Sequence, residues 1–213
     1  MKRLYLACML SLRGCRSYWI PGSYAPTWSE KRTSVLKAIE KEGLQGGTGD
    51  NNWVGRHRHI HDPGIQQEPL IFLADAYGQL GHIDEGLGIL EETQALMETS
   101  GERYYAAEWH QVRGELLWQD GARPQAPATR PQGGDAGTPR VEACFHQALA
   151  VARRQQAKSW ELRAAMRLAR LWQQQGKRAK AYALLAPVYG WFTEGFDTAD
   201  LQEAKVLLEE LAE

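Results

Sequence analysis

Residues 159–188 read SWELRAAMRLARLWQQQGKRAKAYALLAPV and contain two apolar stripes separated by a single glycine, Gly176. Side chains three or four positions apart share one face of a helix. A glycine just after such a stripe can adopt the left-handed conformation that ends a helix. The stretch therefore predicts two helices joined by a tight turn, with apolar faces made of Leu162, Ala165, Leu168, Ala169 and Trp172, and of Ala181, Leu184, Leu185 and Val188.

The same arrangement of an apolar residue, a glycine and a second apolar helix recurs upstream. Its three copies are Tyr77/Gly81/Leu90, Leu117/Gly121/Phe145 and Trp172/Gly176/Leu185. The first landmark advances by 40 and then 55 residues, whereas the last advances by 55 and then 40. A 40-residue repeat with a 15-residue insertion in its second copy explains these spacings. Repeated helical hairpins bury their apolar faces against each other, so the pattern predicts a stacked solenoid whose surface suits binding.

The rest of the chain divides into two regions around this repeat. Residues 68–213 are predicted to be an all-α domain of about three hairpins plus a C-terminal capping helix, with Pro69 in the first helical turn. The segment 121–139 holds four Pro and four Gly and is predicted to be a flexible loop. Residues 1–67 are predicted to be irregular, with one helix near 28–42.

The totals exclude several classes of protein. The net charge is −1, which gives no reason to expect nucleic acid as a partner. No apolar run approaches the roughly 18 residues of a membrane-spanning helix, so no membrane partner is expected. The three cysteines, Cys8, Cys15 and Cys144, are too scattered for a disulfide framework, and Cys144 is predicted to fill the core.

The N-terminus allows two interpretations of localisation. Basic residues followed by Leu4–Leu12 are similar to a short signal peptide, and Cys15 follows Gly14 as in a bacterial lipoprotein cleavage site. The apolar stretch is short, however, and Arg13 is a poor residue at that place. We therefore expect a cytoplasmic protein, with export through Cys15 as the alternative.

The sharpest chemical hypothesis is the cluster His57, His59 and His61. On an extended strand these imidazoles would share one face and could bind Zn²⁺ with an open position for water, as in a metal-dependent hydrolase. The flanking residues are rich in Gly, Asn and Pro and offer no rigid support for ligands. A solvated loop without metal is the favoured interpretation, and no cofactor is expected.

Three stretches carry a resemblance to a known family. They are FLADAYGQLGHIDEGLGILEE at 72–92, GERYYAAEWHQVRGELLW at 101–118 and EACFHQALAVARRQQAKSWELRAAMRLARLWQQQGKRAKAYALLAPVYGWFTEGFDTADLQEAKVLL at 142–208. They resemble the tetratricopeptide-repeat tail of large bacterial signalling proteins with adenylate/guanylate cyclase and AAA-type ATPase domains, and similar tails occur in large ATP-dependent transcriptional regulators. The resemblance implies a fragment of a larger signalling protein whose catalytic domains would lie upstream, hence no enzyme activity here.

The resemblance also implies a partner-binding groove, because the first helix of each hairpin lines the concave side of such arrays. Transferring the repeat frame places a protein or peptide partner against Asp75, Gln79, Glu108, Gln111, Glu115, Trp118, Gln119, Arg163, Met166, Arg170, Gln173 and Gln174. Four other aromatic residues are predicted to pack in the core or between repeats, namely Trp109, Trp160, Trp172 and Trp191.

Basic residues gather between Arg153 and Lys180, opposed there by Glu161 alone. Arg163, Arg167 and Arg170 follow the spacing i, i+4, i+7 and share a helix face. This basic patch is either a solvated face or a docking site for an acidic partner. The predicted function is protein–protein interaction or regulation, and the alternatives are a metal-dependent hydrolase using the histidines and a fragment of a DNA-binding regulator.

Overall fold

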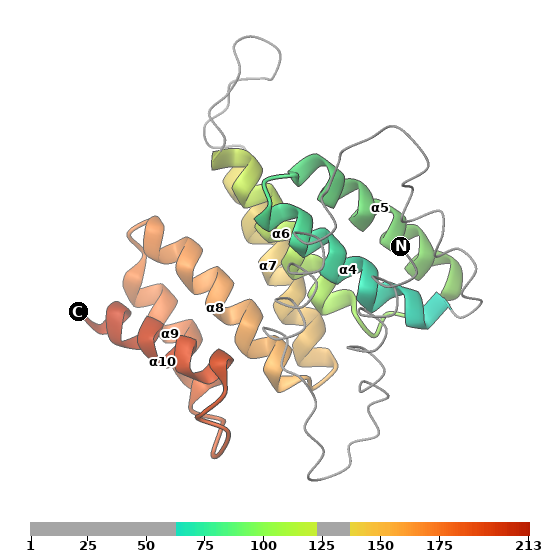
Figure 1. The fold of residues 1–213 in the computed structure, drawn as a ribbon. Coiled ribbons are helices and arrows are strands. Elements are labelled where there is room, and N and C mark those ends of the chain that lie inside the picture. The colour runs from blue at the N-terminus through green and yellow to red at the C-terminus, as the bar shows by residue number, and fades with distance from the viewer. Residues whose placement is uncertain (1–62, 123–136) are drawn as a thin grey trace. The chain divides into compact units, whose positions relative to one another are not determined.

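The computed structural model describes residues 63–122 and 137–213, and all its regular elements there are α-helices (Figure 1). The all-α prediction is confirmed for this part of the chain. Contacts divide the chain into two compact units, Met1–Glu102 and Arg103–Glu213. The boundary falls inside the region predicted as one helical domain, 68–213. The predicted helix near 28–42, Cys8, Cys15 and the histidine cluster lie outside the described residues.

The first unit contains the hairpin of α4 (Pro63–Gln79) and α5 (Ile83–Ser100). Gly81 has a φ of 82°, and the His82 amide donates to the Tyr77 carbonyl at 2.9 Å, which closes the predicted turn. Gly101 ends α5 in the left-handed conformation, with its amide bonded to the Met97 carbonyl. Leu70, Phe72, Ile83, Leu90 and other apolar side chains of both helices are buried.

The start of α4 differs from the sequence prediction. The helix begins at Pro63, within the segment predicted as irregular, and Pro69 lies inside it rather than in its first turn. Pro63 suits a first helical position, where the missing amide would have no helical partner. Pro69 removes one backbone donor, which a helix tolerates best near its N-terminus. The prediction that Pro69 lies in the first helical turn is therefore wrong, because Pro63 occupies the start of α4.

The second unit contains α6 (Ala106–Ala122), α7 (Gly137–Arg154), α8 (Lys158–Gln174), α9 (Arg178–Tyr189) and α10 (Ala199–Ala212). Each helix packs against the next one in the chain, and α8 also contacts α6 and α10 (Figure 1). The α8–α9 turn has the predicted form, since Gly176 has a φ of 72° and the backbone amide of Lys177 donates to the Trp172 carbonyl at 2.8 Å.

The second predicted turn is wrong. Gly121 lies within α6, which continues to Ala122, and the last three residues of the predicted loop 121–139 belong to α7. Residues 123–136 lie outside the described residues. A turn with the same hydrogen bonds instead joins α7 to α8, where Gln156 has a φ of 55° and the Ala157 amide donates to the Ala152 carbonyl. A search for glycine does not find this turn, because Gln156 adopts the left-handed conformation there in place of a glycine.

The core of the second unit combines small and large side chains. Phe145, Leu162, Leu168, Trp172 and Leu185 are all at most 3% exposed. Alanines let neighbouring helix backbones approach closely, and six of them have no exposed surface: Ala148, Ala152, Ala165, Ala169, Ala181 and Ala204. Cys144 is buried at 6% exposure, as expected of a core filler.

One aromatic prediction needs correction. Trp191 was predicted to pack in the core or between repeats, but it is 57% exposed in the α9–α10 connection, where its ring lies edge-on to Phe192. It falls beyond the end of α9 and outside the helical period. Trp118, predicted to face a partner, is half-buried, and its ring lies 6.3 Å from that of Phe145. Trp109 and Trp172 are buried as predicted.

Gly114 on α6 lies directly against Phe145 and Cys144 of α7. A Cβ atom added there would lie 2.6 Å from Cε1 of Phe145. We expect Gly114→Ala to destabilise the protein by about 1–3 kcal/mol, because overpacking outweighs the better helix propensity of alanine.

The matched control is Gly88→Ala in the middle of α5, where an added Cβ meets nothing within 4 Å. Here alanine should stabilise by up to about 1 kcal/mol. Urea unfolding, monitored by circular dichroism, measures the change in unfolding free energy for both variants. Equal effects of the two substitutions would contradict the close α6–α7 contact.

Candidate functional site

Three arginines along α8 form a row, which we call the arginine row (Arg163, Arg167 and Arg170). Nε of Arg163 lies 2.8 Å from Oδ2 of Asp200, and its NH1 lies 3.7 Å from Oε2 of Glu108. The predicted basic patch therefore exists as a common face of α8, but Arg163 joins two carboxylates from two other helices.

The other two arginines of the row are paired in the same way. NH1 of Arg167 lies 3.4 Å from Oε2 of Glu115, and NH2 of Arg170 lies 3.3 Å from Oε2 of Glu203. The carboxylates come from α6 (Glu108 and Glu115) and from α10 (Asp200 and Glu203). The row thus lies where α6 and α10 both meet α8, and its charges are neutralised within the chain.

Burial changes along the row. Glu108 is 1% exposed and Arg163 13% exposed, whereas the side chains of Arg170 and Glu203 are 34% and 56% exposed. A buried carboxylate is costly unless a cation or hydrogen bonds compensate it, whereas an exposed ion pair contributes little. The Arg163 end of the row is therefore structural, and the Arg170 end is exposed to solvent.

The predicted groove residues differ in how far they are exposed to solvent. Four of them are buried: Asp75, Glu108, Gln111 and Met166. The structure leaves these others partly or fully exposed: Gln79, Glu115, Trp118, Gln119, Arg163, Arg170, Gln173 and Gln174. Asp75 and Gln79 belong to the first unit, where Nε2 of Gln79 donates to Oδ2 of Asp75 at 2.9 Å. Met166 belongs to the core of the second unit. The prediction that these residues line a partner groove therefore stays a prediction, and four of them have little exposed surface for such a contact.

The acidic side chains of α10 were missed as site residues. Asp200, Glu203 and Glu210 follow i, i+3, i+10 spacing, and Oε2 of Glu210 accepts from Nε2 of Gln173 at 3.3 Å. The contact between α8 and α10 shows that this acidic face meets the row on α8.

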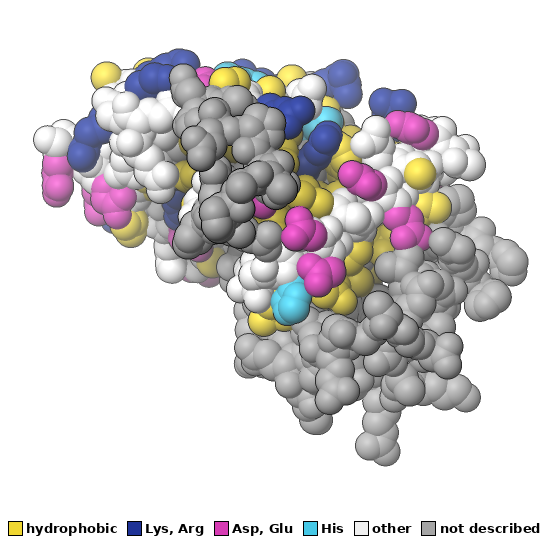
Figure 2. All heavy atoms as spheres, turned by 90° about the horizontal axis from the view of Figure 1, so that it is seen from above, with side chains coloured by type: hydrophobic (Ala, Val, Ile, Leu, Met, Phe, Trp, Pro, Cys, Tyr) yellow, Lys and Arg dark blue, Asp and Glu magenta, His cyan; other side chains and the backbone are white. Residues whose placement is uncertain are grey.

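Beside the open end of the row is a shallow depression of about 290 Å³ between α8 and α10. We call it the α8–α10 depression; Arg170, Gln202, Glu203, Val206, Leu207 and Glu210 line it. Val206 is 53% exposed. More generally, charged side chains of both signs are interspersed over the face drawn in Figure 2.

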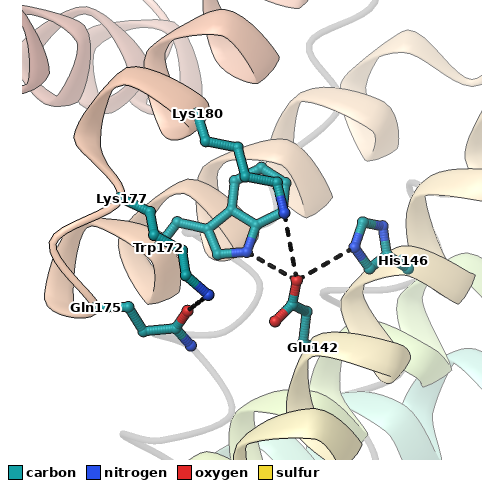
Figure 3. A network of polar contacts seen from close by, with 6 residues as sticks. All are labelled: Glu142, His146, Trp172, Gln175, Lys177 and Lys180. Atoms are coloured by element: carbon teal, nitrogen blue, oxygen red, sulfur yellow. Dashed lines mark hydrogen bonds and ion pairs between the residues drawn. The ribbon is translucent and has the colours of Figure 1, made fainter.

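A second polar cluster surrounds Glu142 and joins α7, α8 and α9 (Figure 3). Oε1 of Glu142 accepts from Nε1 of Trp172 at 2.9 Å and lies 3.6 Å from Nε2 of His146 and 3.7 Å from Nζ of Lys180. Nζ of Lys180 also lies 3.7 Å from the centre of the Trp172 ring. The single carboxylate oxygen thus joins side chains of three helices around a buried indole.

The electrostatics of Glu142 favour its ionised form. Burial raises its pKa, but the Trp172 hydrogen bond and the charges of Lys180, Lys177 and His146 outweigh burial, so that the pKa lies below its ordinary value. The ionised oxygen acts as an acceptor, which suits a structural brace. A general acid at neutral pH would need a raised pKa instead.

Glu161 forms a similar brace near the start of α8. Its Oε1 accepts from Nε of Arg153 at 2.9 Å and its Oε2 from Nζ of Lys158 at 2.7 Å. Burial raises the pKa of Glu161, but the hydrogen bonds and charges of Lys158 and Arg153 outweigh it and lower the pKa below its ordinary value. Arg153 and Lys158, two residues of the basic run between Arg153 and Lys180, thus form ion pairs within the chain.

Metal ligation and membrane insertion receive no support from the described residues. Within 63–122 and 137–213, His, Cys, Asp and Glu side chains form no group of three that could hold a metal ion. No helix in the same ranges is long and apolar enough to cross a membrane. The predicted cluster of His57, His59 and His61 lies outside the described residues.

The unequal burial of the row predicts unequal effects of two similar substitutions on α8. We expect Arg163→Ala to destabilise by about 3–5 kcal/mol, because it removes the cation beside the buried Glu108 carboxylate. Arg170→Ala should cost at most about 1 kcal/mol, since Glu203 is hydrated. Urea unfolding of both variants measures the difference, and similar losses would contradict a structural role for one end of the row.

His110 on α6 predicts a pH dependence of stability. Its Nδ1 is buried with no hydrogen-bond partner among the described residues. Burial, and secondarily the charge of Arg113, lowers the pKa of His110 from 6.5 to about 4. The unfolded chain therefore takes up this proton first, and stability should fall as the pH falls from 6.5 toward 4.

A His110→Gln variant tests this assignment, because it removes the titrating group. It should lose less unfolding free energy between pH 7 and pH 5 than the unsubstituted protein. Above pH 7 the two stability curves should run parallel. A variant with the original slope between pH 7 and pH 5 would show that another group titrates there.

Comparison with known proteins assigns neither a family nor a function to the chain. No protein-family model, curated protein or solved structure matches the chain. The resemblance to tetratricopeptide tails of cyclase–ATPase proteins therefore stays a prediction from the sequence. Any function must be argued from the contacts, burial and charges of the described helices.

Proposed function

We propose that this chain is a protein-interaction and regulatory module, built as a tetratricopeptide-like array of helical hairpins. In this proposal α6 and α8 are the first helices of two successive hairpins, and α10 is the capping helix. The three helices would line one side of the array and present the surface that binds a protein or peptide partner.

The contact of α8 with both α6 and α10 is the observation that carries the proposal. In an array of hairpins every second helix lies beside the next one of its kind, and the arginine row joins these three helices by ion pairs. The repeated turn geometry at Gly81, Gln156 and Gly176 also supports a repeating architecture. Such architectures offer extended concave surfaces that suit binding.

The exposed end of the row is suited to contact with a partner. Gln174 follows Arg170 by four residues and is exposed, so it continues the row beyond its ion pairs. Polar side chains of this kind hold a partner through hydrogen bonds and fix its orientation. In a larger signalling protein, such docking would shift the position of attached catalytic domains and so regulate them.

Selection of peptides from a random phage-displayed library against the full-length chain tests the proposal. Selected peptides should bind more weakly to a Gln174→Lys variant, which changes an exposed residue of the row face. The matched control is Tyr182→Lys, which places the same side chain at a position 43% exposed on α9, the second helix of that hairpin.

Three outcomes separate the possibilities. Loss of binding in Gln174→Lys alone supports a partner site on α6, α8 and α10. Loss in Tyr182→Lys alone would place the site on the other side of the hairpin and contradict this surface. Failure to enrich any peptide that binds the purified chain would contradict the proposed interaction function itself.

A further inference from the structure

Three aromatic side chains of the second unit lie together at the start of α6 and α8. Tyr104 and Tyr105 precede the first residue of α6, and Trp160 lies in the first turn of α8. The Tyr104 ring centre lies 5.3 Å from that of Trp160 and 5.0 Å from that of Tyr105, both in edge-to-face arrangements. Tyr104 is nevertheless 62% exposed, so the cluster presents an aromatic ring to solvent.

Hydrogen bonds hold this cluster against the end of α7. Nε2 of Gln155 donates to the backbone carbonyls of Arg103 and Tyr104 at 2.9 and 3.1 Å. Arg154 directly precedes Gln155 in the chain, and both Arg103 and Arg154 are exposed. Two exposed arginines therefore flank the aromatic cluster. We call Arg103, Tyr104, Arg154 and Trp160 together the Tyr104 surface.

The surroundings of the Tyr104 surface hold more base than acid. Two chain segments form them, 102–105 and 153–161. These segments contain four bases and two acids, Glu102 and Glu161. Glu161 is 5% exposed, and two of the bases share its carboxylate. Neither Arg103 nor Arg154 forms an ion pair with another described residue. The exposed charges beside the cluster are thus two guanidiniums and the Glu102 carboxylate.

Two further acids lie on another side of α8. Nζ of Lys158 lies 5.4 Å from the centre of the Trp191 ring, and Glu194 and Asp197 follow Trp191 in the α9–α10 connection. Side chains two positions apart, such as Lys158 and Trp160, point to roughly opposite sides of a helix. The connection therefore meets the first turn of α8 opposite the aromatic cluster. Without Lys158, the count beside the cluster is still three bases to two acids.

We propose that the Tyr104 surface binds an acidic segment of a partner protein, with an apolar side chain on Tyr104 and Trp160 and Asp or Glu side chains against Arg103 and Arg154. The apolar contact would remove aromatic surface from water. Guanidinium groups can bind carboxylates through two parallel hydrogen bonds. Both features of the surface, the exposed ring and the unpaired cations, are then used by one partner.

This inference goes beyond the partner surface proposed above. Trp160 lies in the first turn of α8, whereas Gln174 is its last residue. The sequence predicted an acidic partner at the arginine row, but the chain itself supplies carboxylates to that row. The arginines beside Tyr104 have no such carboxylate among the described residues, so an acidic partner fits this end of α8 instead.

Fluorescence anisotropy with two labelled peptides and the full-length chain tests the proposal. One peptide combines leucines with glutamates, and in the other every glutamate is replaced by lysine. The glutamate peptide should bind more tightly. Its affinity should fall as sodium chloride rises from about 0.05 to about 0.5 M, because salt screens exposed charges.

Matched variants locate the binding. Arg103→Gln with Arg154→Gln should weaken binding of the glutamate peptide about three- to tenfold, in line with two exposed ion pairs. Arg140→Gln with Lys205→Gln removes the same charge from exposed positions of α7 and α10 and should leave the affinity nearly unchanged. Tyr104→Ala should weaken binding about threefold or more through loss of the aromatic contact. Circular dichroism confirms that each variant stays folded.

Each contrary result has a distinct meaning. Equal weakening by the two double variants would show binding to overall positive charge and overturn the assigned site. Tighter binding of the lysine peptide, or of a labelled oligothymidylate through the same residues, would overturn the partner chemistry. Binding of neither peptide would overturn this inference alone if library peptides still depend on Gln174. A loss of glutamate-peptide binding in Gln174→Lys would also place its site at the other end of α8.

Discussion

The ion pairs of Arg163 determine how the second unit is arranged. Glu108 on α6 is 1% exposed, and an ionised carboxylate at that depth is costly without a nearby cation. Arg163 supplies the cation and also bonds Asp200 on α10 at 2.8 Å. One guanidinium thus lies beside carboxylates of two helices that are far apart in the chain, and α8 packs against both of these helices. The contacts of Arg163 with Glu108 and Asp200 hold the buried end of the row. They thereby also position the exposed end, where the proposed partner binds.

Close helix contacts make this arrangement attainable. Phe145 packs onto α6 at Gly114, where even a Cβ atom would be too close. Fully buried alanines such as Ala165 and Ala169 likewise allow backbones to approach. The left-handed residues Gln156 and Gly176 reverse the chain within a few residues, so that successive helices lie side by side. The braces around Glu142 and Glu161 then join α7, α8 and α9 through ionised carboxylates.

The helices could be predicted where the spacing of apolar residues and the position of a turn-forming residue indicated the same helix boundary. The α8–α9 hairpin satisfied both, and the structure confirms its turn at Gly176. The prediction was wrong where one glycine alone was taken as evidence of a turn, because Gly121 lies within α6. Trp118 shows that one side chain can pack on the core at Phe145 and remain partly exposed. Helical period shows that residues share a face, but the packed neighbour decides whether that face is covered.

By itself, the sequence determined that the described region is helical, where its left-handed turns at Gly81 and Gly176 lie, and that three arginines share a face of α8, because these features depend on residues a few positions apart. Only the tertiary structure decided what that face meets. Asp200 and Glu203 lie 37 and 33 residues beyond the arginines they bond, so no local period reveals the pairing. A run of charges indicates attraction to an opposite charge, but only packing shows whether the chain itself provides it.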